Sequence, residues 1–277
     1  MIQPVDPGPE PGGFGGPERS RMDVEGAERA LFARSSAAFA AADGVLPGRF
    51  LARAHRGLRV LEVTDPDLAF LSTVTGVRES TVHAVPAVLA GAVSRTRPVV
   101  LAQADDAEVG RSLDRAGLVR DGTRALALKA LGPGATDERA GPAGPPIREV
   151  DPGGTAAFLR VLLAGYQAPA AVTQYLAVEH RLPEVRRFTA GPEGTELAAA
   201  AMSLHDGVAV LGGAATRPQQ RGRGAQSALL QHRLREAAHS GCHLAVATVT
   251  PGTVSARNLV RAGFTVLPRP VWRRSSP

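Results

Sequence analysis

A segment rich in glycine, arginine and glutamine stands between a predicted strand and a long predicted helix in the second half of the sequence. It reads GGAATRPQQRGRGAQSALLQHRLREA, with the helix expected over residues 225–238. Glycines let a backbone approach a bound group closely, and the free amides and positive dipole end of a helix N-terminus attract anions. Arg221 and Arg223 add charges that pair well with phosphate. The segment therefore predicts a site for an anion, such as a phosphate group, over Arg221–Gln226.

Three further kinds of turn fit this segment less well or less specifically. An ordinary strand-to-helix turn also uses glycines for its geometry, and a lone Gly-x-Gly does not exclude it. A P-loop would need Gly-Lys followed by Ser or Thr, and the dinucleotide fingerprint would need a third glycine at another offset. Neither of these two patterns is present.

The elements that must position this segment follow from hydrophobic periodicity and from turn residues. Three consecutive strands, punctuated by GPEG and HDG, suit an antiparallel meander ahead of the glycine-rich segment. Strands are expected at 147–150, 185–190, 196–204, 208–216, 243–249 and 264–272, and helices at 155–166, 172–181, 225–238 and 253–261. The second half is thus predicted to be an α/β unit with a mostly antiparallel sheet.

Two stretches of biased composition divide the chain. Residues 1–25 are dominated at their start by Pro, Gly and Glu, which predicts a disordered tail. Residues 132–146 are rich in Gly, Pro and Ala and are typical of a linker. We therefore expect two domains, at residues 26–131 and 147–277.

The first half contains an echo of the end of the chain. The segment SLDRAGLVRDGTRALALK, from Ser112, aligns with NLVRAGFTVLPRPVWRR, from Asn258, through a shared Leu and a shared Arg-Ala-Gly. An apolar strand precedes each copy, at 98–103 and at 243–249. A match this short can arise by chance in a chain rich in Ala and Arg. If it is a duplication, the two halves are copies of one α/β unit.

Composition narrows the class of protein. The 277 residues are 44% hydrophobic, with no apolar run long enough to span a bilayer, so we expect a cytoplasmic protein without a membrane partner. The formal charge of +6 is spread along the chain without a basic run interleaved with aromatics, which argues against a nucleic-acid partner. The single cysteine, Cys242, excludes an internal disulfide, and no metal site is expected.

The glycine-rich segment resembles the central signature of the GNAT acetyltransferase family. That signature is R-x-x-G-x-[G/A] between the fourth strand and the following helix, with a proline a few residues upstream. Pro218, Arg221 and Gly224 match it, whereas Gln226 stands where the family prefers Gly or Ala. The segment SARNLVRAGF, at 255–264, resembles the family's last helix and its Gly-Phe entry into the final strand. The resemblance covers roughly residues 147–274.

The resemblance implies a GNAT-like fold, in which a mixed, mostly antiparallel sheet is flanked by helices and splayed between its fourth and fifth strands. With the first half as a degenerate copy, the chain would hold two tandem domains of this kind. The co-substrate implied is acetyl-CoA, with its pantetheine arm in the splay. The implied cofactor-binding residues are Ala214, Ala215, Thr216, Arg221, Gly222, Arg223, Gly224, Ala225, Gln226, Ser255 and Asn258.

The acid and base of such a reaction are harder to assign. Many family members carry a glutamate on the fourth strand, but VAVLGGAAT contains no acid, and Leu259 stands where the family often has a tyrosine. Glu179 and Tyr175, on the helix expected to border the acceptor site, are the candidates for catalysis. A solvated helix face would explain Glu179 equally well.

The implied activity is transfer of an acetyl group to the primary amine of a small molecule, by direct attack in a ternary complex. A non-catalytic acyl-CoA sensor and an enzyme that acetylates a protein N-terminus or lysine remain alternatives. The first half lacks anything like RGRGAQ. It is therefore expected to wall the acceptor site or to form a homodimer face.

Overall fold

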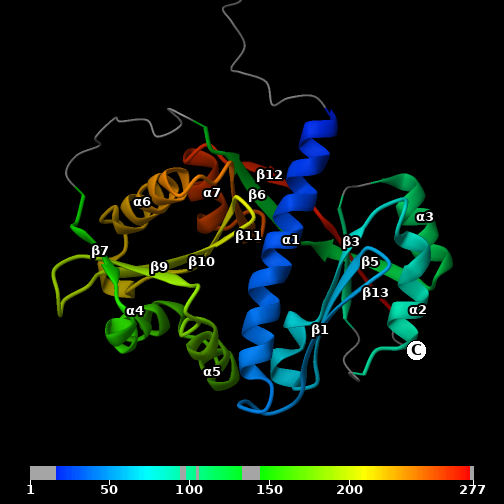
Figure 1. Cartoon of the computed structure of the whole chain (residues 1–277), viewed down its shortest axis with the longest axis horizontal. Coiled ribbons are helices and arrows are strands. Elements are labelled where there is room, and N and C mark those ends of the chain that lie inside the picture. The colour runs from blue at the N-terminus through cyan, green and yellow to red at the C-terminus, as the bar shows by residue number, and fades with distance from the viewer. Residues whose placement is uncertain (1–16, 94–97, 104–105, 133–143, 275–277) are drawn as a thin grey trace, which may run out of the picture.

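The computed structural model describes residues 17–93, 98–103, 106–132 and 144–274, which form two sheets with helices around them (Figure 1). The two sheets lie on either side of the long helix α1 (Pro17–Ala42). We expected a tail through residue 25, and this is wrong for its last part because α1 begins at Pro17. Glu25 faces Arg59 and Arg78 in ion pairs, which gives this end of the helix a partner in the first sheet.

The first sheet has six strands in the order β1-β2-β3-β4-β13-β5. Its strands from the first half are β1 (Phe50–His55), β2 (Leu58–Val63), β3 (Thr73–Val77), β4 (Val99–Ala102) and β5 (Leu118–Thr123). Helices α2 (Val85–Ala90) and α3 (Ala107–Arg115), with the 3-10 turns η1 (Pro66–Leu71) and η2 (Val82–Ala84), accompany it. Among these described strands, only the β3–β4 contact is parallel. The sheet is therefore mostly antiparallel.

The second sheet has seven strands in the order β12-β6-β11-β10-β9-β8-β7. They are β7 (Ile147–Val150), β8 (Arg186–Ala190), β9 (Ala198–His205), β10 (Val208–Thr216), β11 (Leu244–Val249), β12 (Thr265–Leu267) and, from the first half, β6 (Ala125–Ala130). The helices are α4 (Thr155–Tyr166), α5 (Ala170–Glu179), α6 (Ala225–His239) and α7 (Val254–Arg261). Apart from small shifts of their ends, the predicted helices and strands of the second half are confirmed through α7.

Each sheet is completed by a strand from the other half of the chain. Strand β6 pairs with β11 and β12 in the second sheet, whereas β13 (Pro270–Arg274) pairs with β4 and β5 in the first. The two segments cross where the amide of Arg124 donates to the carbonyl of Arg269, at 3.0 Å. The sheets therefore do not follow the division of the sequence at residues 132–146, and residues 133–143 lie outside the described part of the chain.

The strand expected over residues 264–272 is two strands, β12 and β13. Pro268 and Pro270 flank the break, and neither can donate a backbone hydrogen bond to a strand ladder. The chain leaves the second sheet after Leu267 and enters the first at Pro270. The internal sequence match follows the same course, because α3, β5 and the exchanged β6 mirror α7, β12 and the exchanged β13.

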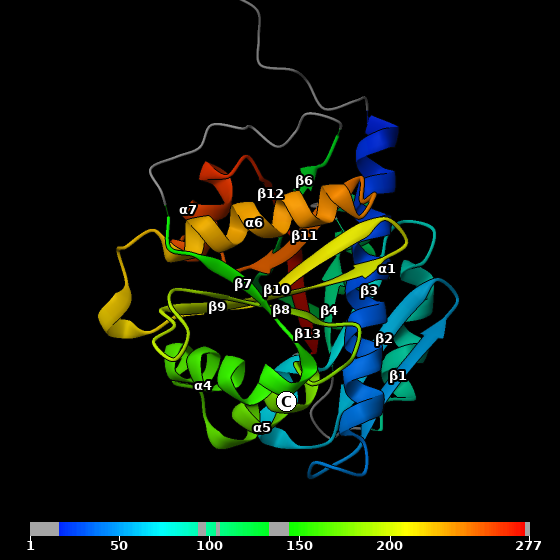
Figure 2. The same ribbon diagram turned by 60° about the vertical axis from the view of Figure 1, so that its left-hand side comes forward.

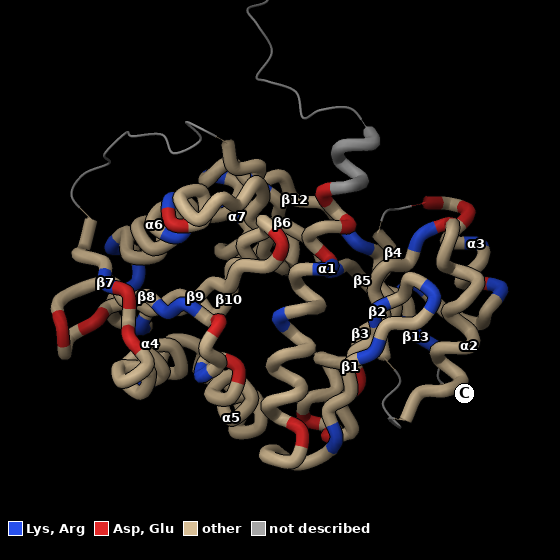
Figure 3. The backbone as a smooth tube through the Cα atoms, viewed as in Figure 1, with Lys and Arg blue, Asp and Glu red and all other residues tan. Residues whose placement is uncertain are grey.

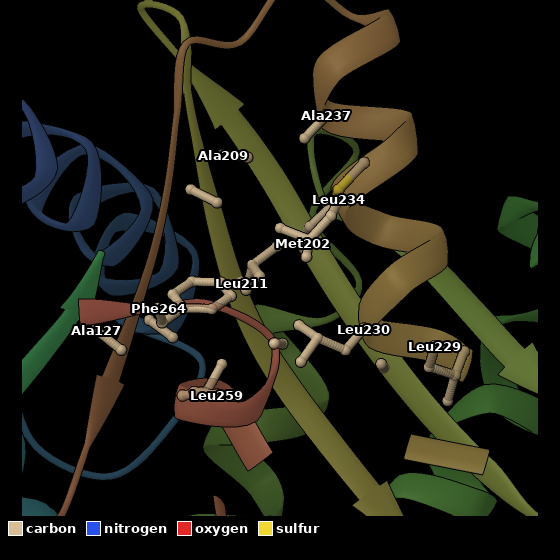
Figure 4. Close-up of a cluster of buried hydrophobic side chains, with 14 of the residues drawn as sticks. Ala127, Met202, Ala209, Leu211, Leu229, Leu230, Leu234, Ala237, Leu259 and Phe264 are labelled. Carbon is tan, nitrogen blue, oxygen red and sulfur yellow. The ribbon is translucent and has the colours of Figure 1, made fainter. Parts of the chain in front are cut away.

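Helices cover both faces of the second sheet, with α6 on one face and α4 on the other (Figure 2). In β9, Ala198, Ala200 and Met202 belong to the core under α6, whereas Ala199 and Ala201 pack with α4. Figure 4 shows leucines of α6 pointing toward Met202 and Leu211 of the sheet. The helices on opposite faces fix the backbone that enters α6, which is where the predicted site lies.

Candidate functional site

The turn before α6 has the backbone that the sequence predicts for an anion site. Gly222 and Gly224 have φ values of 78° and 76°, in the left-handed region that favours glycine. Ala228 donates to the carbonyl of Gly224, so the amides of residues 225–227 precede the first turn of hydrogen bonds. The Arg221 guanidinium donates to the carbonyl of Gly165 at 3.3 Å, which ties the turn to the end of α4.

Strands β10 and β11 separate just before this turn. They pair in parallel only from Val208 with Leu244 to Val210 with Val246, although β10 continues to Thr216. A cavity of about 210 Å³ lies where the strands diverge. We call it the strand gap, and its lining is Tyr166, Leu211, Gly212, Gly213, Ala214, Gln226, Leu230, Arg233, Ala247, Thr248, Ser255, Asn258 and Leu259.

A bulge bends β10 along the wall of this gap. The register against β9 shifts between Gly212 and Ala215, and Gly213 has a φ of 55°. A Cβ at Gly213 would lie 1.9 Å from Nε2 of His180, so only glycine fits here. His180 is fully buried, its Nδ1 lies 2.8 Å from the carbonyl of Leu176, and its Nε2 has no hydrogen-bond partner among the described residues. Burial lowers the pKa of His180, so the ring is neutral at neutral pH.

Two polar side chains that the sequence analysis missed reach the strand gap. The amide of Ala214 donates to the hydroxyl of Tyr166 at 3.1 Å, and desolvation raises the pKa of that phenol. Arg233 is buried on α6, where it donates to the carbonyls of Leu229 and Ala201. Burial lowers the pKa of Arg233 to about 10, which still leaves the side chain charged at neutral pH. The sequence feature that could have identified Arg233 is a charged residue at the same helical spacing as the buried leucines of α6.

A larger cavity of about 460 Å³ lies between the two halves of the chain. We call it the interface cavity. Residues of α1 and the first sheet line it on one side, and residues of α5, β10 and β11 line it on the other. Leu211, Gly212, Gly213 and Thr248 line both this cavity and the strand gap. The two cavities therefore meet at the bulge of β10.

An ion pair between the halves stands beside this junction. Nε of Arg34, on α1, lies 2.9 Å from Oε1 of Glu179, on α5, and both side chains line the interface cavity. Arg34 also donates to the carbonyl of Val210, and a Cβ at Gly212 would lie 3.2 Å from its guanidinium. Burial pushes the pKa of Glu179 up, but the charge of Arg34 and its hydrogen bond outweigh burial and bring the pKa below its ordinary value. Glu179 is therefore ionised at neutral pH.

Tyr175 also lines the interface cavity. Its ring is buried, stacked on Phe50 and edge-on to Phe39, at centroid distances of 6.2 and 6.1 Å. Burial, and then the charge of Glu179, raise the pKa of its hydroxyl. The structure thus brings the two residues predicted for catalysis into one cavity, with Glu179 nearer to the bulge through its contact with Arg34.

Ten of the eleven residues predicted to bind the cofactor fall into three groups, and the eleventh, Thr216, is half-buried at the end of β10. Ala214, Gln226, Ser255 and Asn258 line the strand gap, although the Asn258 side chain also accepts from Arg261. Arg221, Gly222, Arg223 and Gly224 are exposed at the turn outside it. Ala225 is buried in the core under α6, and Ala215 packs against α4 on the other side of β10. The side chains of Ala215 and Ala225 therefore face the core, and neither residue lines the strand gap.

In the described part of the chain, neither the distribution of basic residues nor the arrangement of potential metal ligands indicates a separate binding site. The basic residues of the described chain are spread over both halves (Figure 3). Within the ranges that the structure describes, no group of three or more His, Cys, Asp or Glu could hold a metal ion. In the same ranges, no helix combines the length and the apolar character needed to cross a bilayer.

Comparison with known proteins finds a family model that matches part of the second half. Residues 158–264 match the model of the acetyltransferase (GNAT) family. The matched range runs from α4 to the entry of β12 and so contains the strand gap, the bulge and the glycine-rich turn. Among curated proteins, none matches this chain.

Solved structures show that the fold likeness extends over both halves. A GCN5-related N-acetyltransferase from Kribbella flavida matches with a TM-score of 0.55 and 18% identity, over 87% of this chain and 96% of its own. A GCN5-related N-acetyltransferase from Sphaerobacter thermophilus matches with a TM-score of 0.52 and 16% identity, over 91% of each chain. A functionally unknown conserved protein from Staphylococcus epidermidis matches with a TM-score of 0.56 and 11% identity, over 84% and 96%. At these identities the likeness establishes the fold.

Proposed function

We propose that the chain transfers an acetyl group from acetyl-CoA to the primary amine of a small molecule, on the premise that residues 158–264 match the model of the acetyltransferase (GNAT) family. The observation that carries the proposal is the junction of the two cavities at the β10 bulge. One cavity ends at the glycine-rich turn and suits the acetyl donor. The other lies between the halves and suits the acceptor.

The strand gap supplies the groups that would hold acetyl-CoA. The free amides of residues 225–227, the dipole of α6 and the charges of Arg221 and Arg223 favour a pyrophosphate at the turn. Beyond Val210 the edge of β10 no longer pairs with β11, so its backbone groups at Ala214 and Thr216 can pair with the pantetheine amides as another strand would. Nε2 of Gln226 is buried without a hydrogen-bond partner among the described residues, and it can donate to the same ligand.

The transfer itself requires no protein nucleophile. The acceptor nitrogen forms a bond to the thioester carbon, the carbon–sulfur bond breaks, and the nitrogen loses a proton while the thiolate gains one. Backbone amides at the bulge would stabilise the charge that develops on the carbonyl oxygen. Glu179 would orient the ammonium and accept its proton, and Tyr166, the phenol that lines the strand gap, would protonate the leaving thiolate.

The shape of the interface cavity favours a small acceptor over a protein. Its volume of about 460 Å³ falls within the range of roughly 300–1,000 Å³ that is usual for small-molecule sites. Aromatic side chains from both halves form its walls, including Phe32 and Phe39 of α1 and Tyr175 of α5. We infer that Tyr175 shapes the cavity beside Glu179.

Calorimetric titration with acetyl-CoA, followed by a thiol-release assay against a panel of small amines, tests the proposal. We expect saturable binding and release of thiol with at least one amine. Binding without release on any amine would favour the sensor, and release only with peptide amines would favour acetylation of proteins. Absence of binding would refute the cofactor site.

Two glycine variants test whether acetyl-CoA binds at the turn before α6. Gly224→Val should weaken binding of acetyl-CoA by at least about tenfold, because a β-branched residue at positive φ distorts the turn. Gly241→Val is the matched control, since Gly241 has a φ of 78° at the other end of α6 and, like Gly224, open space around its Cα. Equal loss of binding in both variants would show that the turn has no special part in it.

A further inference from the structure

The charges that line the interface cavity do not balance. Glu28 and Glu179 contribute two negative charges, and Arg34, Arg124 and Arg269 contribute three positive ones. Arg34 pairs with Glu179 at 2.9 Å, and Arg269 pairs with Glu28 at 3.1 Å. Arg124 is left as the cation without a carboxylate among the lining residues.

Glu28 is unable to form an ion pair with Arg124 as well, because both of its carboxylate oxygens already accept hydrogen bonds. Oε1 accepts from Arg269, and Oε2 accepts from the amide of Gly76 at 3.0 Å and from the side chain of Gln103 at 2.8 Å. Nη1 of Arg59 lies 3.6 Å from the same oxygen. The carboxylate is fully buried, so these partners are needed to stabilise it and keep it in place.

Arg124 and Arg269 stand next to each other at the crossing of the exchanged strands. The Arg124 amide donates to the Arg269 carbonyl at 3.0 Å, and its guanidinium donates to the carbonyl of Phe70 at 3.1 Å. Nε of the buried Arg269 has no hydrogen-bond partner among the described residues. Burial and the neighbouring charges of Arg273 and Arg269 lower the pKa of Arg124. Among the described residues, one guanidinium without a carboxylate and one donor without an acceptor therefore line this end of the cavity.

We propose that the acceptor carries an anionic group, a carboxylate or a phosphate-like group, which Arg124 and Arg269 bind at the strand crossing while its amine lies at the β10 bulge. This rests on the proposed function, because it assigns the interface cavity to the acceptor. Guanidinium groups bind both kinds of anion through charge-assisted hydrogen bonds.

The sheet register sets the distance between the two ends. Thr248 lines both cavities, and it pairs with Leu126, while Val249 pairs with Ala125, the residue after Arg124. Two strand residues span roughly 7 Å. Phe32, Phe39 and Tyr175 line the same cavity, so the body between amine and anion is apolar. The substrate class is thus an amine joined to an anion through a short apolar or aromatic spacer.

A matched pair of probes tests this class by binding, independently of turnover. The probes are 4-(aminomethyl)benzoate and the uncharged 4-(aminomethyl)benzamide, titrated by calorimetry into the full chain saturated with coenzyme A. We expect the benzoate to bind at least about tenfold more tightly, in line with a hydrogen bond to a charged group. The phosphonate analogue, (4-(aminomethyl)phenyl)phosphonate, shows which anion the site prefers.

Variants of Arg124 connect the preference to this side chain. Arg124→Met should abolish the preference for the anionic probes, and Arg124→Lys should retain part of it. Arg273→Met is the matched control, because Arg273 is a half-exposed arginine that pairs with Asp121 outside the cavity. The thermal unfolding of each variant is compared with that of the natural chain.

The outcomes separate this proposal from the function on which it rests. A preference lost in Arg124→Met and kept in Arg273→Met supports an anionic acceptor. Equal binding of the charged and uncharged probes, binding of neither, or a preference kept in a folded Arg124→Met would overturn it. Thiol release with other amines under those conditions would leave the transferase activity standing.

Discussion

Strands β3 and β10 hold corresponding places in the two sheets, and each has an irregular register next to a glycine of positive φ. In β3 the shift lies between Val74 and Val77, around Gly76, and in β10 it lies between Gly212 and Ala215. The bulge of β3 is filled by the protein itself. The amide of Gly76 donates to Glu28, and its carbonyl accepts from the hydroxyl of Thr81.

The neighbouring strands behave differently as well. Strand β3 stays paired with β4 to its last residue, Val77, which pairs with Ala102, whereas β10 leaves β11 after Val210. The helix that follows β3 is the short α2, and the helix that follows β10 is the 15-residue α6. The comparison indicates that the proposed ligand site depends on strands that diverge and on a bulge that the protein leaves open. In the first half, the groups at the corresponding bulge instead bind a buried charged side chain of the protein itself.

The largest effect we expect comes from the exchanged strand. Trp272 of β13 is buried in the core of the first sheet, against α3. Trp272→Ala should lower the free energy of unfolding by about 3–5 kcal/mol, because it leaves a large cavity there. Urea unfolding followed by circular dichroism measures it, with Val260→Ala, an exposed position on α7, as the control.

Hydrogen exchange would show which strands lose stability in the Trp272→Ala variant. Protection should fall first in β4 and β5, the neighbours of β13, and later in β8 and β9. Equal loss of protection in both sheets would mean that the sheets unfold as one unit and that the comparison between halves does not extend to stability.

The next largest effect concerns the ion pair that joins the halves. Arg34→Met leaves the mostly buried carboxylate of Glu179 unpaired and should cost about 3 kcal/mol of stability. Arg29→Met, which removes an exposed arginine of the same helix, should have little effect. A double variant with Glu179→Gln should recover part of the loss. If the double variant is no more stable than Arg34→Met, the pair is not the cause.

The same variant has a pH signature. The folded-state pKa of Glu179 is lowered, so its stabilising contribution is present above the ordinary pKa of a glutamate and disappears as the pH falls through the folded value. Removing Arg34 raises that pKa, and the acid limb of kcat/KM should therefore move to higher pH. An unchanged limb would show that Glu179 does not titrate in the reaction.

A pair of glycine variants compares the two bulges directly. Gly213→Ala places a Cβ against His180, and Gly76→Ala places one 2.6 Å from the carbonyl of Gly57. Each should cost about 1–3 kcal/mol, since both glycines have positive φ. Only Gly213→Ala should also weaken acetyl-CoA binding in calorimetry. Weaker binding in both variants would mean that the bulge of β3 supports the cofactor site from a distance.

The smallest effect is a dependence on pH that originates at His180. Burial lowers its pKa in the folded state, so the unfolded chain binds the proton first as the pH falls below about 6.5. Stability should therefore fall with pH in this window, by up to about 1.4 kcal/mol per unit from this residue. His180→Asn should flatten the slope in urea titrations between pH 7 and pH 5. An unchanged slope would assign it to other groups, such as His205 and His232, whose pKa values burial also lowers.

The sequence by itself determined the local parts of the site. Glycines at 222 and 224, the arginines beside them and the periodicity of α6 encode a strand, a turn and a helix N-terminus, because these depend on residues that are near one another in the chain. The helices and strands of the second half follow from the same short-range patterns. Composition was a poorer guide at the start of the chain, since α1 extends into residues that resemble a tail.

Only the tertiary structure decided which half completes which sheet and what surrounds the interface cavity. Strands β6 and β13 have patterns that suit either sheet, so their exchange depends on how the two units pack. Arg34 and Arg124 are ordinary arginines in the sequence, and their importance comes from packing against β10 and Arg269. Contacts between residues far apart in the chain carry no periodic signal, because their partners are chosen by the packing of whole elements.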